Sequence, residues 1–99
     1  MNTIKLNDSR YSLKYRKEDA CINFNVEKMY QRLPGISIYE SLDDSKMFEV
    51  VVITKSVGEL DADDLEFYIE EMLTAFETIK EIKQILEQDF DLEVIYTIR

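Results

Sequence analysis

The first half of the chain alternates apolar and polar residues in short runs, which predicts β-strands. Apolar residues alternate with polar ones over residues 11–16 and again over 21–26. A period of two places the apolar side chains of each run on one face of a strand. The connection over 17–19 is short and polar, so the two runs are predicted to pair as a hairpin.

A turn at Pro34-Gly35 separates this hairpin from two further predicted strands. Ile36 and Ile38 begin the third strand, and a loop over 43–45 follows it. The fourth strand, over 47–54, is different because apolar residues occupy both parities. Such a strand is usually central in its sheet, with both faces at least partly covered.

Residues 61–88 form the one long helix that the pattern predicts. Asp61 is a suitable N-cap, and the acids just after it suit the positive end of the helix dipole. One apolar stripe recurs at spacings of four and three along the helix: Leu65, Ile69, Met72, Phe76 and Ile79. The helix spans about 42 Å at ~1.5 Å per residue, whereas an eight-residue strand spans about 26 Å. Either the helix bends, or its second half projects beyond the sheet. Lys83 falls on the apolar stripe, which indicates that the stripe is no longer buried there.

A final alternation over 92–98 predicts a C-terminal strand. The fold class that follows is α+β, in a single small domain over residues 1–99. It combines a four-strand antiparallel meander, one long amphipathic helix and the C-terminal strand. A right-handed crossover through the helix lays the last strand parallel to the strand over 47–54.

One helix shields one face of such a sheet and leaves the other face open. The open face is expected to carry Val51, Ile53 and Ile95 near its middle. Its border is polar: Ser12, Lys14, Arg16, Cys21, Asn23 and Asn25. Two alternatives remain for its cover, a contact with a second copy or another protein, or the N-terminal segment with Ile4 and Leu6 folded across it.

Charge is divided along the chain. Residues 1–33 contain seven bases and four acids, whereas residues 34–99 contain five bases and seventeen acids, within an overall net charge of −9. No base lies between Lys55 and Lys80. Uncompensated charge of this density destabilises a compact state and disfavours direct binding to nucleic acid. It favours a basic protein as the partner.

Catalytic and metal-binding residue sets are largely missing from the sequence. There is no histidine, which is the commonest general base and metal ligand. Cys21 has no histidine to activate it and is interpreted as a half-buried strand residue. Asp61, Asp63 and Asp64 resemble the start of a calcium loop, but the glycine and the terminal glutamate of that motif are missing, so helix capping explains them better. The sequence predicts no enzyme activity, no cofactor and no metal site.

The sequence also predicts a cytoplasmic protein that does not bind a membrane. Residues 1–17 contain no apolar run of signal-peptide length, and no stretch approaches the roughly 18 apolar residues of a membrane span. A single cysteine excludes a disulfide within the chain.

The acidic part of the helix is the candidate partner-binding site. Its residues are Glu59, Asp63, Glu66, Glu70, Glu71 and Glu77. A charged outer face serves solubility in most amphipathic helices, and that explanation applies here as well. Two details favour an interface. Pairs such as Glu66 and Glu70 repel without compensating lysines, and regularly spaced carboxylates can occupy a groove whose Lys and Arg otherwise bind phosphate.

In composition, rich in Ile, Lys, Glu, Asn and Tyr, the chain resembles small proteins of phages and mobile elements in low-GC bacteria. Among these are anti-CRISPR and anti-restriction inhibitors, several of which mimic DNA. No motif carries this resemblance, and no residue role follows from it. The leading hypothesis is an inhibitor of a basic nucleic-acid-binding enzyme. The alternatives are an immunity protein or antitoxin that neutralises a toxin, and a structural scaffold that forms a homodimer.

Overall fold

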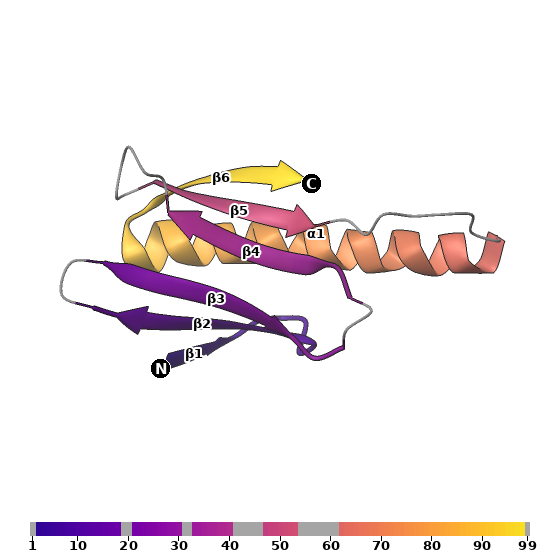
Figure 1. Ribbon diagram of the computed structural model, residues 1–99, viewed down its shortest axis with the longest axis horizontal. Helices are drawn as coiled ribbons and strands as arrows, with labels where there is room; N and C mark the ends of the chain where they lie inside the picture. Colours follow the sequence, from indigo (N-terminus) through magenta and orange to yellow (C-terminus); the bar gives the residue numbers. More distant parts are fainter. Residues whose placement is uncertain (1, 19–20, 31–32, 41–46, 54–61, 99) are drawn as a thin grey trace.

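The computed structural model describes residues 2–18, 21–30, 33–40, 47–53 and 62–98. Six strands and one helix follow one another along these residues (Figure 1). They are β1 (Asn2–Lys5), β2 (Tyr11–Lys17), β3 (Ile22–Lys28), β4 (Gly35–Glu40), β5 (Met47–Ile53), α1 (Ala62–Phe90) and β6 (Glu93–Ile98). The α+β class predicted from the sequence is confirmed.

The strands form two three-stranded sheets, in the orders β1-β2-β3 and β4-β5-β6. The predicted hairpin is confirmed, since β2 pairs antiparallel with β3. The predicted four-strand antiparallel meander is wrong, because among the described residues no ladder joins β3 to β4 although the two strands run side by side (Figure 1). The corner between them explains the break. Leu33 turns into the core with 2% of its surface exposed, and Pro34 has no N–H to donate to a ladder.

The N-terminal strand β1 was not predicted. It pairs antiparallel with β2 at the edge of its sheet, with Ile4 opposite Leu13. Leu6, just after it, is buried in the core beneath the helix. The N-terminal segment therefore does not cross the open face of the sheets, which rules out that alternative for the cover.

The crossover through α1 has the predicted geometry. β5 pairs antiparallel with β4 on one side and parallel with β6 on the other, so it is the central strand of its sheet. Val50, Val51 and Val52 have no exposed surface. Apolar residues on both faces of β5 thus correctly indicated its central position.

The helix projects beyond the sheets at its N-terminal end, and not in its C-terminal half as expected (Figure 1). Residues 63–67 are all exposed, whereas Ile82 and Leu86 are fully buried. The lengths of the two connections explain the difference. Two residues link α1 to β6 and eight link β5 to α1. The short link, in which Asp91 adopts a left-handed φ of 54°, fixes the C-terminal end of α1 against the sheet.

The prediction was wrong because a charged residue on the apolar stripe, Lys83, was interpreted as a sign that the stripe is no longer buried there. Its ammonium instead lies 2.8 Å from the Glu87 carboxylate and 5.6 Å from the centre of the Tyr96 ring. The hydrogen bond to Glu87 raises the pKa of Lys83. The long stem of the side chain reaches the border of the buried surface while its charge stays in water.

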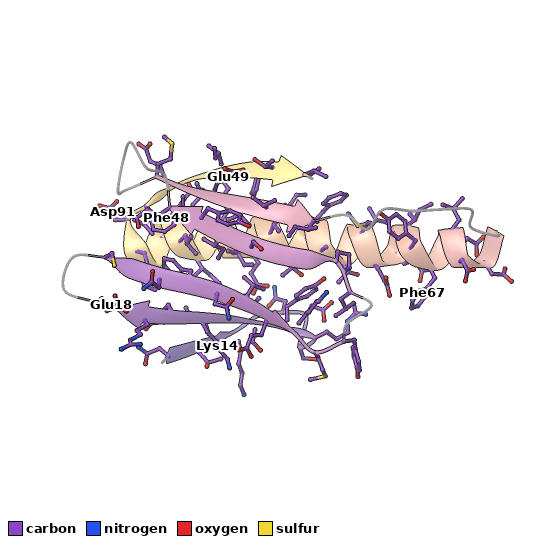
Figure 2. The ribbon with its side chains drawn as sticks, viewed as in Figure 1. Lys14, Glu18, Phe48, Glu49, Phe67 and Asp91 are labelled. Atoms are coloured by element: carbon purple, nitrogen blue, oxygen red, sulfur yellow. The ribbon has the colours of Figure 1, made fainter. Side chains whose placement is uncertain are left out.

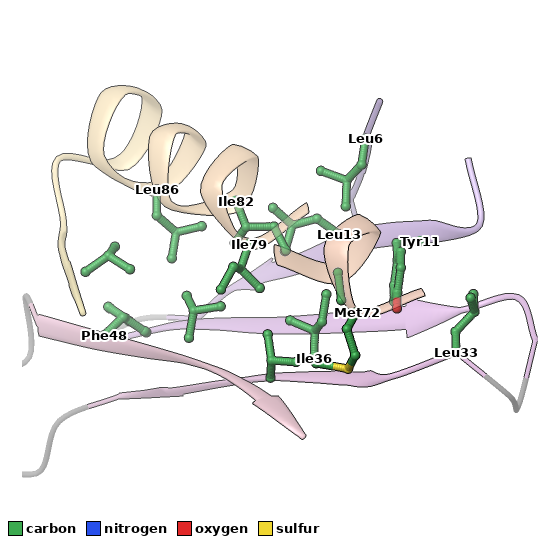
Figure 3. Packing of buried hydrophobic residues seen from close by; sticks show 14 residues of the cluster. Leu6, Tyr11, Leu13, Leu33, Ile36, Phe48, Met72, Ile79, Ile82 and Leu86 are labelled. Carbon is green, nitrogen blue, oxygen red and sulfur yellow. The ribbon is translucent and has the colours of Figure 1, made fainter. Parts of the chain in front are cut away.

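The core lies between α1 and one face of both sheets (Figure 3). The helix contributes Met72, Ala75, Ile79, Ile82 and Leu86. Phe48, Leu13 and Ile36 are among the residues that meet them from the strands. At the closed end of the core, Phe24 packs edge-on against both Phe48 and Phe90, with ring centres 5.5 and 5.1 Å apart. Phe76, expected at the centre of the helical stripe, is only partly buried at its border.

Tyr11 ties the two halves of the fold together, and its hydroxyl predicts a dependence of stability on pH. The hydroxyl donates a 2.8 Å hydrogen bond to the carbonyl oxygen of Pro34. Burial raises the pKa of Tyr11 to about 12 from 10.0. As the pH rises, the unfolded chain therefore loses this proton before the folded chain does. The contribution of the Tyr11 hydroxyl to the free energy of unfolding is fully present below pH 10, and roughly 2–3 kcal/mol is lost as the pH rises through 12.

Tyr11→Phe tests this account in urea unfolding. The variant is expected to lose about 1–3 kcal/mol at pH 7, because the buried Pro34 carbonyl loses its donor. It is also expected to lose less stability than the wild type between pH 9 and 11. If both proteins weaken equally over that interval, another group causes the alkaline loss.

Candidate protein-binding face of the helix

Four of the six predicted site residues lie together on the outward face of α1. Asp63, Glu66, Glu70 and Glu77 are exposed. At ~100° per residue they fall within roughly 60° of one another around the helix axis. These four residues are called the acidic face below. Glu59 lies outside the described residues.

Little in the fold compensates the charge of the acidic face. Glu77 has a weak contact with Lys80, 3.5 Å between Oε1 and Nζ, and both side chains are largely exposed. No ion pair to Asp63, Glu66 or Glu70 occurs among the described residues. The three carboxylates therefore repel one another along a solvated helix, which costs stability instead of adding to it.

Glu71 is a correction, because it lies within the buried stripe and not on the outward face. Only 9% of its surface is exposed. The pKa of Arg10 is raised mainly by its hydrogen bond to Asp8, and the charge of Glu71 adds to that rise. Glu71 thus faces β2, and it is excluded from the acidic face.

Exposed apolar side chains flank the acidic face on both sides. Leu65, Ile69 and Leu73 recur every four residues along one flank, and each is about half exposed. Phe67, which is 45% exposed, lies on the other flank, on the part of the helix that extends beyond the sheets (Figure 2). Leu65 and Ile69 were predicted to be core residues because the sequence pattern gave no sign that the helix outruns the sheet at its N-terminal end. Together these four residues are called the apolar flanks.

A cleft of about 660 Å³ lies at the inner end of the acidic face. The turn between β1 and β2 forms one wall, and the stretch of α1 from Leu73 to Glu81 forms the other. Both carboxylate oxygens of Glu81 accept a hydrogen bond from the N–H of Asn7, at 2.9 and 3.0 Å. Arg10 donates to Asp8 at 3.0 and 2.7 Å, and these hydrogen bonds lower the pKa of Asp8. Arg10 neutralises Asp8, so Glu77 and Glu81 supply the negative charge that suits a basic side chain in this open cleft.

The open face of the sheets has the predicted apolar middle and polar border. Ile53 and Ile95 are about half exposed on either side of the fully buried Val51. At the border, Lys14 and Glu27 form an ion pair of 2.9 Å. This face is not open throughout, since Val51 at its middle has no exposed surface.

Three further features bear on the remaining predictions: Cys21, the placement of acidic side chains, and the apolar character of the helix. Cys21 lies in the connection between β2 and β3, with its sulfur 3.9 Å from a carboxylate oxygen of Glu18. No group of three or more acids and cysteines is placed to hold a metal ion among the residues described. The helix described here is not both long and apolar enough to cross a membrane.

Comparison of the chain with protein-family models, with curated proteins and with solved structures finds no match in any of the three. The acidic face and its apolar flanks are therefore interpreted from their own geometry and chemistry.

Proposed function

We propose that this protein inhibits a basic, nucleic-acid-binding enzyme by docking α1 into the groove that otherwise holds nucleic acid. One observation carries the proposal: Asp63, Glu66 and Glu70 of the acidic face lie on the part of the helix that projects beyond the sheets, and Glu77 continues the face to the cleft beside the sheet. A projecting rod can enter a groove that a globular surface cannot.

The chemistry of the acidic face suits such a groove. Lys and Arg side chains that pair with phosphate pair equally with carboxylate, and the helix presents carboxylates at a fixed spacing. Nucleic-acid phosphates and the carboxylates of α1 therefore compete for the same Lys and Arg side chains. The protein acts in this respect as a mimic of nucleic acid, in the manner of anti-CRISPR and anti-restriction inhibitors.

The apolar flanks add a contact that nucleic acid itself does not offer. Four half-exposed side chains around the acidic face would lose apolar surface to water on docking, at roughly 25 cal/mol per Å² removed. Charge gives fast association and steers the helix to a basic groove, whereas buried apolar contacts slow dissociation. This combination suits a stoichiometric inhibitor better than a transient contact.

Capture from a lysate of the source organism tests the proposal when it is joined to competition. The wild-type protein is immobilised, and the captured partner is identified by mass. The partner is expected to bind nucleic acid, and duplex or single-stranded nucleic acid is expected to displace it. A captured toxin that does not bind nucleic acid would instead support the immunity-protein or antitoxin alternative.

A further inference from the structure

The two outer edges of the sheets differ in how they are protected. β1 is a four-residue strand with Lys5 at its end, and both features are common ways to prevent an edge from pairing with another chain. β6 is six residues long, and its only charged residue is Glu93 at its start. Among the described residues, nothing pairs with the outer edge of β6.

β6 also exposes apolar side chains on both of its faces. Ile95 is 49% exposed on the open face, and Tyr96 and Ile98 are 44% and 60% exposed on the helix side. The helix covers this edge only in part: an open hollow of about 310 Å³ lies between Tyr96 and the stretch of α1 from Lys80 to Gln88, and the Lys83 ammonium reaches to 5.6 Å from the centre of the Tyr96 ring. An edge of this kind is a template for another strand.

We propose that β6 pairs antiparallel with β6 of a second copy of this chain, with Tyr96 on the two-fold axis. In this register Val94 lies opposite Ile98, and Ile95 lies opposite Thr97. Each pair lies on one face of the joined sheet, as an antiparallel ladder requires. The β4-β5-β6 sheets of the two copies then become one six-stranded sheet, in which the β6 edge of each copy is paired.

Charge favours a second copy as the occupant over an unrelated strand. Glu93 is the one charged residue of β6 and stands at its start, so an antiparallel copy places the two Glu93 side chains at opposite ends of the paired strands, with uncharged residues between them. The C-terminal end of β6 and the projecting half of α1 point the same way (Figure 1). The two-fold axis therefore sends the two acidic faces to opposite ends of the dimer, where their repulsion is weakest.

Light scattering on the purified full-length chain tests the pairing. The wild type is expected to show twice the mass of 11.7 kDa. Ile98→Lys places charges in the joined sheet and is expected to weaken the dimer roughly tenfold or more. Ile53→Lys is the matched control, because Ile53 is a half-exposed isoleucine on the open face and should leave the dimer intact.

A cysteine trap tests the register without relying on loss of assembly. In a Cys21→Ser background, Tyr96→Cys is expected to form a disulfide-linked dimer on mild oxidation, because side chains on the two-fold axis directly face one another. Ile53→Cys in the same background is expected to remain unlinked. A wild-type monomer at all concentrations overturns the proposal. Dissociation of the dimer by Ile53→Lys but not by Ile98→Lys also overturns it, because the contact would then lie on the open face. A strand of a different protein bound along β6 in place of a second copy overturns it as well.

Discussion

Reversal of Glu66, Glu70 and Glu77 together to lysine is expected to weaken partner binding by roughly a thousandfold or more. In the proposed complex each carboxylate faces a basic side chain in a water-poor groove. Reversal replaces each attraction with a repulsion between like charges. The helix is expected to remain folded, since all three side chains are exposed. Binding is measured by calorimetry and helix content by circular dichroism.

Glu18, Glu40 and Asp89 provide the matched control. These acids are also exposed but lie away from the acidic face. Their reversal to lysine changes the net charge by the same amount. The control variant is expected to lose only the part of the affinity that comes from overall charge, and that part should diminish with added salt, which shortens the range of the field to about 8 Å at physiological ionic strength. Equal losses in both variants would mean that the helix is only a solvated face.

Leu86→Ala is expected to cost about 2–5 kcal/mol of the free energy of unfolding. Leu86 has no exposed surface and packs in the core near the fixed end of the helix (Figure 3). The free energy of unfolding of a domain of 99 residues is itself only about 5–15 kcal/mol, so this variant is expected to unfold at a much lower urea concentration than the wild type.

Leu73→Ala is the control for this truncation, because it removes the same atoms from the same helix at a side chain that is 58% exposed. Its cost is expected to stay near 0.5 kcal/mol, roughly that of an ordinary surface change. A large loss at Leu73 would show that something covers the projecting half of the helix in solution. A small loss at Leu86 would show that α1 is not held to the sheets as described.

The elements could be predicted from the sequence because the period of apolar residues directly reflects which face is buried. The central position of β5 and its parallel pairing with β6 followed from apolar residues on both parities and from the handedness of the crossover. The break between β3 and β4 could not be predicted, since alternation identifies a strand but not its neighbour. β1 is too short for its single apolar residue, Ile4, to show a period.

The candidate site was predicted only in part, because a helical stripe shows which residues could be buried but not where the sheet ends. Glu71 was placed outside, although it lies beside Met72 in the buried stripe. Leu65 and Ile69 were placed inside, although the sheet does not reach them. Both errors have one physical cause. Which end of α1 projects depends on the lengths of its two connections, and the local pattern of the helix does not contain that information.

Photo-crosslinking from two positions tests the central proposal most directly. A photoreactive phenylalanine analogue replaces Glu70 on the acidic face or Asn25 on the open face, which lie on opposite sides of the molecule. Position 70 is expected to crosslink to the surface of the partner that binds nucleic acid, and added nucleic acid is expected to suppress the product. Crosslinks from position 25 alone would contradict the proposal and place the contact on the sheet.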